Sequence, residues 1–221
     1  MIAILFLVLN ISPFYEADFL SLPGRSISIF SNPAGLGIQP GAELLFTYHP
    51  QPKTLTSGLE LGNVGFGIKK VDSLLYFEIG VGYKLPGAVA LGYSYIFGDT
   101  SSYIFGLLCR PSASFSIGYR TTLGEKKAMR GGIGIRPFKR YLTLCFDLEY
   151  EGIDDTLCYF YGGILEPMQG VRLQFYTDED FNWHAGLELS SERINLAGSY
   201  SSVNKKLSGG IIFSAQKYHR E

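Results

Sequence analysis

The chain has 221 residues and a formal net charge of −1, so its length suits one all-β domain and no bulk attraction to nucleic acid is indicated. Charged residues make up 18%, less than the roughly 25% of soluble domains. The chain has 27 glycines, 15 tyrosines and 16 phenylalanines against one tryptophan. This composition is typical of a barrel wall with rings toward lipid and small residues toward a crowded lumen.

The N-terminal stretch is apolar and short. Residues 2–9 form an unbroken apolar run, too short to span a membrane as a helix but of the length found in the centre of a secretory signal peptide. We therefore predict a signal peptide over residues 1–17, with a buried first strand as the alternative. No later run reaches about 18 apolar residues, which excludes a helical membrane protein.

Residues 18–41 differ from everything that follows them. Pro33 and Pro40 interrupt any continuous strand ladder there, and the neighbouring glycines suit tight turns. We predict a compact plug or hatch with about one helical turn, packed against or inside the rest of the structure.

From residue 42 to residue 215 the sequence alternates with a period of two. In 113–122, Phe115 and Ile117 fall on one side, and Ser116 and Gly118 fall on the other. Such segments of about ten residues separated by brief turns indicate a transmembrane antiparallel β-barrel. We predict about fourteen strands, with twelve as the fallback, at 42–49, 56–62, 64–71, 74–84, 88–97, 102–110, 113–122, 128–137, 141–150, 156–165, 170–177, 181–190, 193–201 and 206–215.

The apolar face of these strands is predicted to contact lipid. An Arg or Lys on the lipid face at the bilayer midplane would cost about 2–4 kcal/mol, so the polar face is placed inside. Both signs of charge occur on that face, so pairs between neighbouring strands can neutralise them. The candidates for lining the lumen are Glu78, Lys84, Arg120, Arg136, Asp147, Glu149, Arg172, His184 and Glu188.

A soluble secreted β-sandwich is the alternative fold. Its polar face would be solvated and rich in Lys, Glu and Thr. Gly and Ser dominate that face in several strands, which favours the barrel.

The sequence offers little catalytic or metal-binding chemistry. Cys109, Cys145 and Cys158 are scattered and form no CxxC pair, so neither a disulfide framework nor a metal site is indicated. His49 and His184 lie far apart in the sequence, and the Gly-x-Gly pairs are not followed by a helix as a phosphate loop would be. We predict that the chain is not an enzyme and has no cofactor.

One motif and a later group of segments resemble a known family. The motif at 31–36, which contains Asn32, Pro33, Ala34 and Gly35, resembles the plug segment of FadL-like outer-membrane proteins, where an Asn-Pro-Ala motif introduces the barrel. The order of the segments 134–137, 142–144, 147–150, 166–167, 171–173, 185–187 and 194–196 is similar to the barrel half of PorV-like members. That group includes long-chain fatty-acid transporters and proteins linked to type IX secretion.

The resemblance implies a fourteen-stranded barrel in the outer membrane with an N-terminal plug. The favoured function is to bind or pass a hydrophobic small molecule, and displacing the plug would open the path. The alternative is a non-transporting scaffold or secretion-associated barrel of PorV type. The expected partners are outer-membrane lipid, a hydrophobic ligand and, in the alternative, other envelope or secretion proteins, but no nucleic acid.

Overall fold

The computed structural model describes residues 13–14, 19–22, 24–38, 40–124, 127–152 and 156–215. Within these residues two short 3-10 helices, η2 (Ser26–Ile29) and η3 (Pro33–Gly37), precede fourteen strands. The strands are β1 (Gly41–Pro50), β2 (Lys53–Gly62), β3 (Val64–Val71), β4 (Leu74–Lys84), β5 (Val89–Gly98), β6 (Ser102–Ser112), β7 (Phe115–Gly124), β8 (Ala128–Ile135), β9 (Leu142–Glu151), β10 (Thr156–Met168), β11 (Val171–Asp178), β12 (Trp183–Ser190), β13 (Ile194–Ser201) and β14 (Leu207–Ser214).

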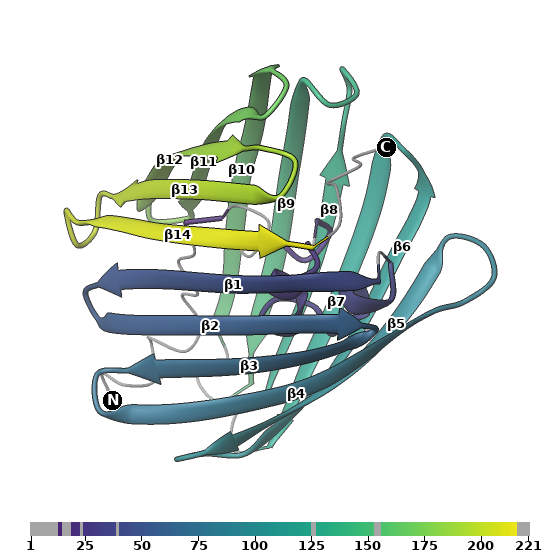
Figure 1. Ribbon diagram of the computed structural model, residues 1–221, viewed down its shortest axis with the longest axis vertical. Coiled ribbons are helices and arrows are strands. Elements are labelled where there is room, and N and C mark those ends of the chain that lie inside the picture. The colour runs from purple at the N-terminus through teal and green to yellow at the C-terminus, as the bar shows by residue number, and fades with distance from the viewer. Residues whose placement is uncertain are drawn as a thin grey trace.

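The sheet closes on itself. Each strand pairs antiparallel with its neighbours in the sequence, and β1 pairs with β14 from Glu43 opposite Ser214 to Tyr48 opposite Gly209 (Figure 1). Closure gives every strand two hydrogen-bonded neighbours and leaves no open edge. The all-β barrel with fourteen strands is therefore confirmed, and the two-layer sandwich is wrong.

The first strand of the barrel begins, and the last strand ends, on the same side of the barrel. We call the side where β1 begins and β14 ends rim A, and the side where β1 ends and β2 begins rim B. The turns are short, as between β10 and β11, where Gly170 adopts a φ of 83° that favours glycine. The connection at 136–141, between β8 and β9, lies at rim A.

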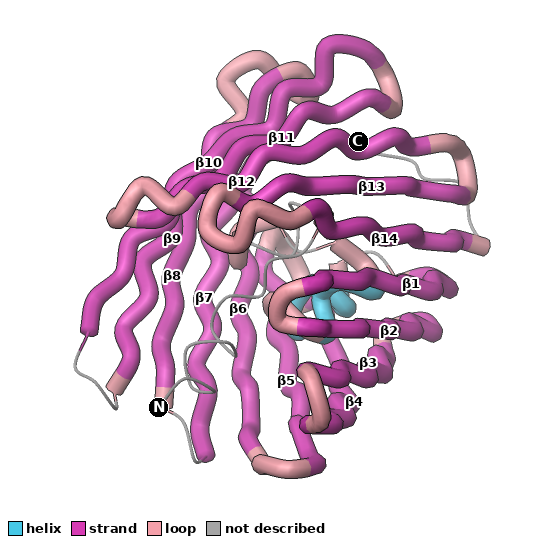
Figure 2. Tube along the Cα trace, turned by 90° about the vertical axis from the view of Figure 1, so that its left-hand side faces the viewer, coloured by secondary structure: helices cyan, strands magenta, loops and turns pink. Residues whose placement is uncertain are grey.

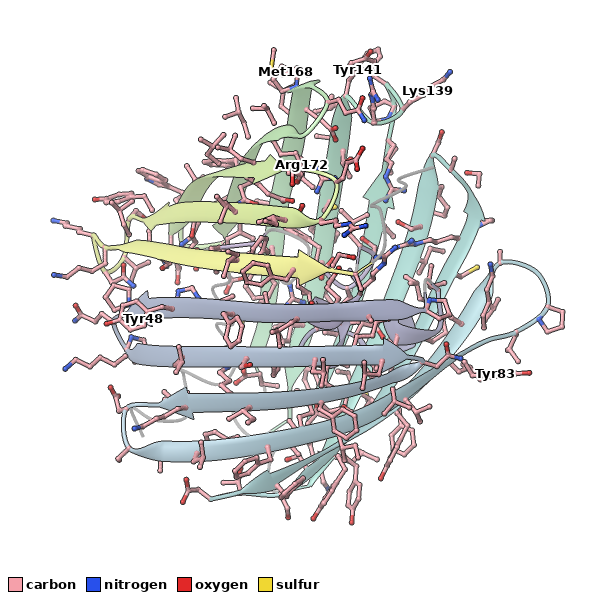
Figure 3. All side chains as sticks on the ribbon, in the orientation of Figure 1. Tyr48, Tyr83, Lys139, Tyr141, Met168 and Arg172 are labelled. Carbon is pink, nitrogen blue, oxygen red and sulfur yellow. The ribbon has the colours of Figure 1, made fainter. Side chains whose placement is uncertain are left out.

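The alternation in the sequence becomes an inside and an outside. On β9, Cys145 and Asp147 are buried, whereas Leu144 and Phe146 are exposed. The same pattern runs through the other strands, because successive side chains of a strand point to opposite faces. The outward set is almost entirely apolar, and its side chains stand out from the wall in Figure 3.

Aromatic rings gather on the outer surface toward rim B. The rings of Phe77 on β4 and Phe97 on β5 stack with centroids 5.5 Å apart, and those of Tyr95 on β5 and Tyr103 on β6 stack at 4.9 Å. Rows of aromatic side chains are typical of the boundary between a membrane and water. No helix among the described residues is both long and apolar enough to span a membrane.

A segment of the chain fills part of the interior. We call residues 19–22 and 24–38 the inner segment; its helix η3 packs against β4, β5 and β6, and η2 packs against β1 to β4. Figure 2 shows the two helical turns enclosed by the strands. Ile29 and Leu36 are completely buried there.

The predicted signal peptide, residues 1–17, lies outside the described residues except for Pro13 and Phe14. Phe14 packs in the interior with Ile27 and Ile212. The side-chain amide of Gln174 donates a hydrogen bond to the carbonyl of Pro13.

Candidate functional site

Asn32 holds the centre of the inner segment. Its Oδ1 accepts a hydrogen bond from the backbone of Ala34 at 3.2 Å and so caps η3, which begins with Pro33. Its Nδ2 donates to the carbonyls of Leu20 at 3.2 Å and of Leu107 on β6 at 3.1 Å. One buried side chain therefore joins the helix start, the preceding turn and the wall.

Glycines line the wall beneath the inner segment. A Cβ atom added at Gly92 on β5 would collide with the backbone of Pro33 and Ala34, and one added at Gly82 on β4 would lie 2.8 Å from the Cβ of Leu36. Only a residue without a side chain lets the two backbones approach so closely. An added Cβ would also collide with the inner segment at Gly67, Gly80, Gly106 and Gly118. These glycines, which include the Gly-x-Gly pair of Gly80 and Gly82, thus form a docking surface.

Buried polar groups fix η2 to the seam between β1 and β14. Glu43 on β1 accepts hydrogen bonds from the backbone N of Ser26 at 3.0 Å and from its hydroxyl at 2.6 Å. Nη1 of Arg25 donates to the hydroxyl of Ser214 on β14 at 2.9 Å. On β2, Glu60 lies directly opposite Glu43 and is completely buried.

A second buried cluster fixes the start of the inner segment. Oδ2 of Asp147 accepts hydrogen bonds from the backbone N of Leu20 and from Nε of Arg130, both at 3.0 Å. Nη1 of Arg130 lies 3.6 Å from Oε2 of Glu149, and the guanidinium lies 4.7 Å from the ring centroid of Phe160. Asp147 and Glu149 are shielded from water, and Arg130 is in direct contact with both carboxylates, which compensates their charge.

Two more of the predicted lumen residues form hydrogen bonds inside the barrel. Nη1 of Arg120 donates to the carbonyl of Ser31 at 2.9 Å and to that of Phe30 at 3.4 Å, at the junction of η2 and η3. Glu78 accepts a hydrogen bond from the hydroxyl of Ser94 at 2.6 Å. Arg120 thus adds a cationic contact to the backbone of the inner segment.

Arg172 and Glu188 form a separate cluster toward rim A. Nε of Arg172 lies 3.2 Å from Oε2 of Glu166, and its Nη1 lies 3.3 Å from Oε1 of Glu188. The arginine is therefore balanced by two carboxylates from neighbouring strands.

The three remaining predicted lumen residues lie apart from these clusters. His184 is buried, with its ring 5.4 Å from that of Tyr176. Lys84 is exposed at the last position of β4. Arg136 follows the end of β8, and its guanidinium donates to the carbonyl of Ala113 at 3.1 Å.

Sequence reasoning missed several residues of these clusters. Arg130 has the same parity on β8 as the inward Gly132, and Glu166 has the same parity on β10 as the inward Ile164. Alternation alone could therefore have found both. Arg25 lies in the inner segment outside any strand, and no local pattern marks it.

The inner wall also carries an apolar patch. Cys145, Phe160, Ile164 and Tyr176, from β9, β10 and β11, form one buried cluster with Phe19 and Leu22 of the inner segment. The rings of Phe19 and Tyr176 meet edge to face with centroids 5.7 Å apart. Moving the inner segment away would expose an apolar surface inside the barrel.

Among the described residues, no three His, Cys, Asp or Glu side chains come together in a way that could hold a metal ion.

No protein-family model and no curated protein matches this sequence. Solved structures match it by shape. The outer membrane protein Omp33 of Acinetobacter baumannii gives a TM-score of 0.59 at 10% identity, covering 80% of this chain and 99% of that one. The TodX monoaromatic hydrocarbon channel, as a deltaS2 mutant, gives 0.58 at 9% identity, covering 96% and 100%. A mutant of the Rh. blastica porin gives 0.51 at 11% identity, covering 80% and 99%.

These proteins share the closed antiparallel barrel. The chain therefore has the fold of outer-membrane β-barrel porins and channels.

Proposed function

We propose that the chain spans the outer membrane as a channel for a small hydrophobic molecule and that the inner segment keeps its lumen closed. Strands of 8–13 residues match the roughly 9–11 residues that a tilted strand needs to cross a bilayer. The exposed outer side chains are apolar along these strands. In water such a surface would far exceed the apolar patches that soluble monomers expose.

The apolar patch on the inner wall carries the proposal about the ligand. Phe19 and Leu22 of the inner segment cover Phe160, Ile164 and Tyr176. When these two side chains leave, they vacate a site that takes apolar groups of similar size. A polar solute would gain nothing from that surface, whereas a hydrophobic one would replace the lost contacts.

The structural comparison and the family resemblance support the same class of ligand. TodX, which shares the fold, is a channel for monoaromatic hydrocarbons. The resemblance of the motif at 32–35 to FadL-like plugs fits a barrel whose N-terminal segment closes the lumen.

A reversible disulfide can test whether the inner segment must move. The side chain of Leu22 lies against Gly134, which is directly opposite Cys145 on β9. We expect Leu22→Cys, with Cys109 and Cys158 replaced by Ala, to form a disulfide with Cys145 upon oxidation with diamide, visible on a non-reducing gel. Uptake of the hydrophobic probe N-phenyl-1-naphthylamine by intact cells should then fall to the level of cells without the chain. Reduction should restore it.

Leu36→Cys in the same background is the matched control. Leu36 packs against Gly65 and Gly82 on β3 and β4, away from Cys145, so oxidation should leave its uptake unchanged. Equal uptake by the oxidised and reduced Leu22→Cys protein would contradict the channel proposal. A wild-type chain that adds no uptake would favour the non-transporting scaffold, and envelope proteins recovered with it from native membranes would then identify its partners.

The thiol of Cys145 also reports on docking of the inner segment. Asn32→Ala removes hydrogen bonds worth about 0.5–1.5 kcal/mol each, so the undocked population should rise about tenfold. We expect a maleimide to label Cys145 correspondingly faster in a chain without the other two cysteines. Ser191→Ala, which removes bonds at the exposed turn before β13, is the control and should leave the rate unchanged.

A further inference from the structure

The loop between β8 and β9 at rim A combines exposed cations with exposed rings. It contains Phe138, Lys139, Arg140 and Tyr141, and the exposed fraction of the Phe138 side chain reaches 65%. The guanidinium of Arg140 lies 5.3 Å from the ring centroid of Tyr141. Figure 3 shows Lys139 and Tyr141 at this end of the barrel. We call residues 136–141 the basic loop.

Hydrogen bonds connect the basic loop with its neighbours along rim A. Arg136 donates from its backbone N to the carbonyl of Ser114, in the turn between β6 and β7, at 2.8 Å. The backbone N of Arg110, near the end of β6, donates to the carbonyl of Ala88, in the turn between β4 and β5, also at 2.8 Å. With Lys84 at the end of β4, these segments form a continuous arc of rim A from β4 to β9 in which every charged side chain is positive.

Acidic residues are scarce in this part of the sequence. Between residues 79 and 146 the chain has only two acids, Asp99 and Glu125. Asp99 follows β5, a strand that ends at rim B, and Glu125 lies outside the described residues. The next part of rim A is balanced, because Arg172 contacts two glutamates there. On rim A, the excess of positive charge thus lies in the arc that contains the basic loop.

The rings indicate the depth at which this charge lies. Aromatic side chains concentrate at the boundary between hydrocarbon and headgroups, and long cationic side chains extend from there to phosphates. Tyr83, Phe138 and Tyr141 are exposed along the arc, beside the apolar outer surface. In a barrel that spans a membrane, Lys139 and Arg140 therefore lie level with lipid phosphates.

We propose that the basic loop binds the phosphate of an anionic phospholipid in the leaflet at rim A, through Lys139 and Arg140. This proposal rests on the proposed membrane-spanning function. A basic residue near an anionic membrane surface contributes about 1 kcal/mol, so the pair together should favour anionic over zwitterionic lipid roughly thirtyfold.

The single tryptophan makes the test direct, because Trp183 lies at rim B, where β12 begins. In Trp183→Phe/Tyr141→Trp the only tryptophan lies beside the basic loop. The protein is reconstituted into vesicles containing either brominated phosphatidylglycerol or brominated phosphatidylcholine, and quenching of the tryptophan gives the relative affinity for the two lipids. We expect a roughly thirtyfold preference for phosphatidylglycerol, which decreases as salt is raised.

Adding Lys139→Gln and Arg140→Gln should reduce the preference to about one. The matched control is Lys205→Gln/Lys206→Gln, an equal change in charge at rim B, where Lys205 shares with Lys139 a φ near 55°. Its preference should equal that of the parent.

Equal quenching by both lipids in the parent would overturn the proposal, and would point to a soluble acidic partner for the arc. A preference that survives the double substitution would overturn it too. Quenching by neither lipid would instead contradict the membrane-spanning barrel itself.

Discussion

Gly92→Ala is expected to open the barrel to small solutes while the wall stays folded. The added Cβ atom would collide with the backbone of Pro33 and Ala34, which the wall cannot avoid because β5 is paired on both sides. Overpacking of this kind costs about 1–3 kcal/mol. The cost falls on the docked state alone, since the undocked segment no longer touches Gly92. The undocked population should therefore rise about tenfold or more, because 1.4 kcal/mol corresponds to a factor of ten.

Swelling of proteoliposomes in a small sugar measures this opening. The control is Gly131→Ala on β8, where an added Cβ meets no atom within 4 Å, so its swelling rate should match that of the parent. The heat-dependent shift in gel mobility of the folded barrel should persist in both variants. An unchanged swelling rate in Gly92→Ala, with the barrel intact, would show that the inner segment does not limit passage.

The wall could be predicted from the sequence because its pattern is local. A strand presents its two faces in alternation, so Asp147 and Glu149 could be assigned to the inside from their immediate neighbours alone. Closure follows from the same pattern. An apolar outer face lies in hydrocarbon, where no water can pair with the backbone groups of an open strand edge. The strand ends were less well defined, and β2 begins at Lys53 rather than at residue 56.

The contacts of the inner segment could not be predicted in the same way. The bond from Leu20 to Asp147 joins residues 127 positions apart, and that from Arg25 to Ser214 joins residues 189 positions apart. No periodicity encodes such pairs. The glycines of the wall were visible as small residues, but their purpose depends on which backbone lies against them, which only the folded chain reveals.

Arg130→Met is expected to cause the largest loss of stability of any single substitution considered. It keeps the length of the side chain but removes the cation in direct contact with both Asp147 and Glu149, although neither reaches water. Removing one partner of a buried ion pair costs about 3–5 kcal/mol, because the remaining charge is no longer compensated. The midpoint of urea unfolding of the barrel in detergent should fall accordingly.

Arg193→Met is the control, because Arg193 is exposed at rim A, and its midpoint should change by no more than about 0.5 kcal/mol when converted to free energy. Adding Asp147→Asn and Glu149→Gln to Arg130→Met should recover most of the lost stability, since neutral amides need no cation and Asn at 147 can still accept the hydrogen bond from Leu20. Recovery would identify the uncompensated charge, rather than lost packing against Phe160, as the cause. An unchanged midpoint in Arg130→Met would show that these carboxylates are compensated without Arg130, and would contradict the proposed contribution of this ion pair to stability.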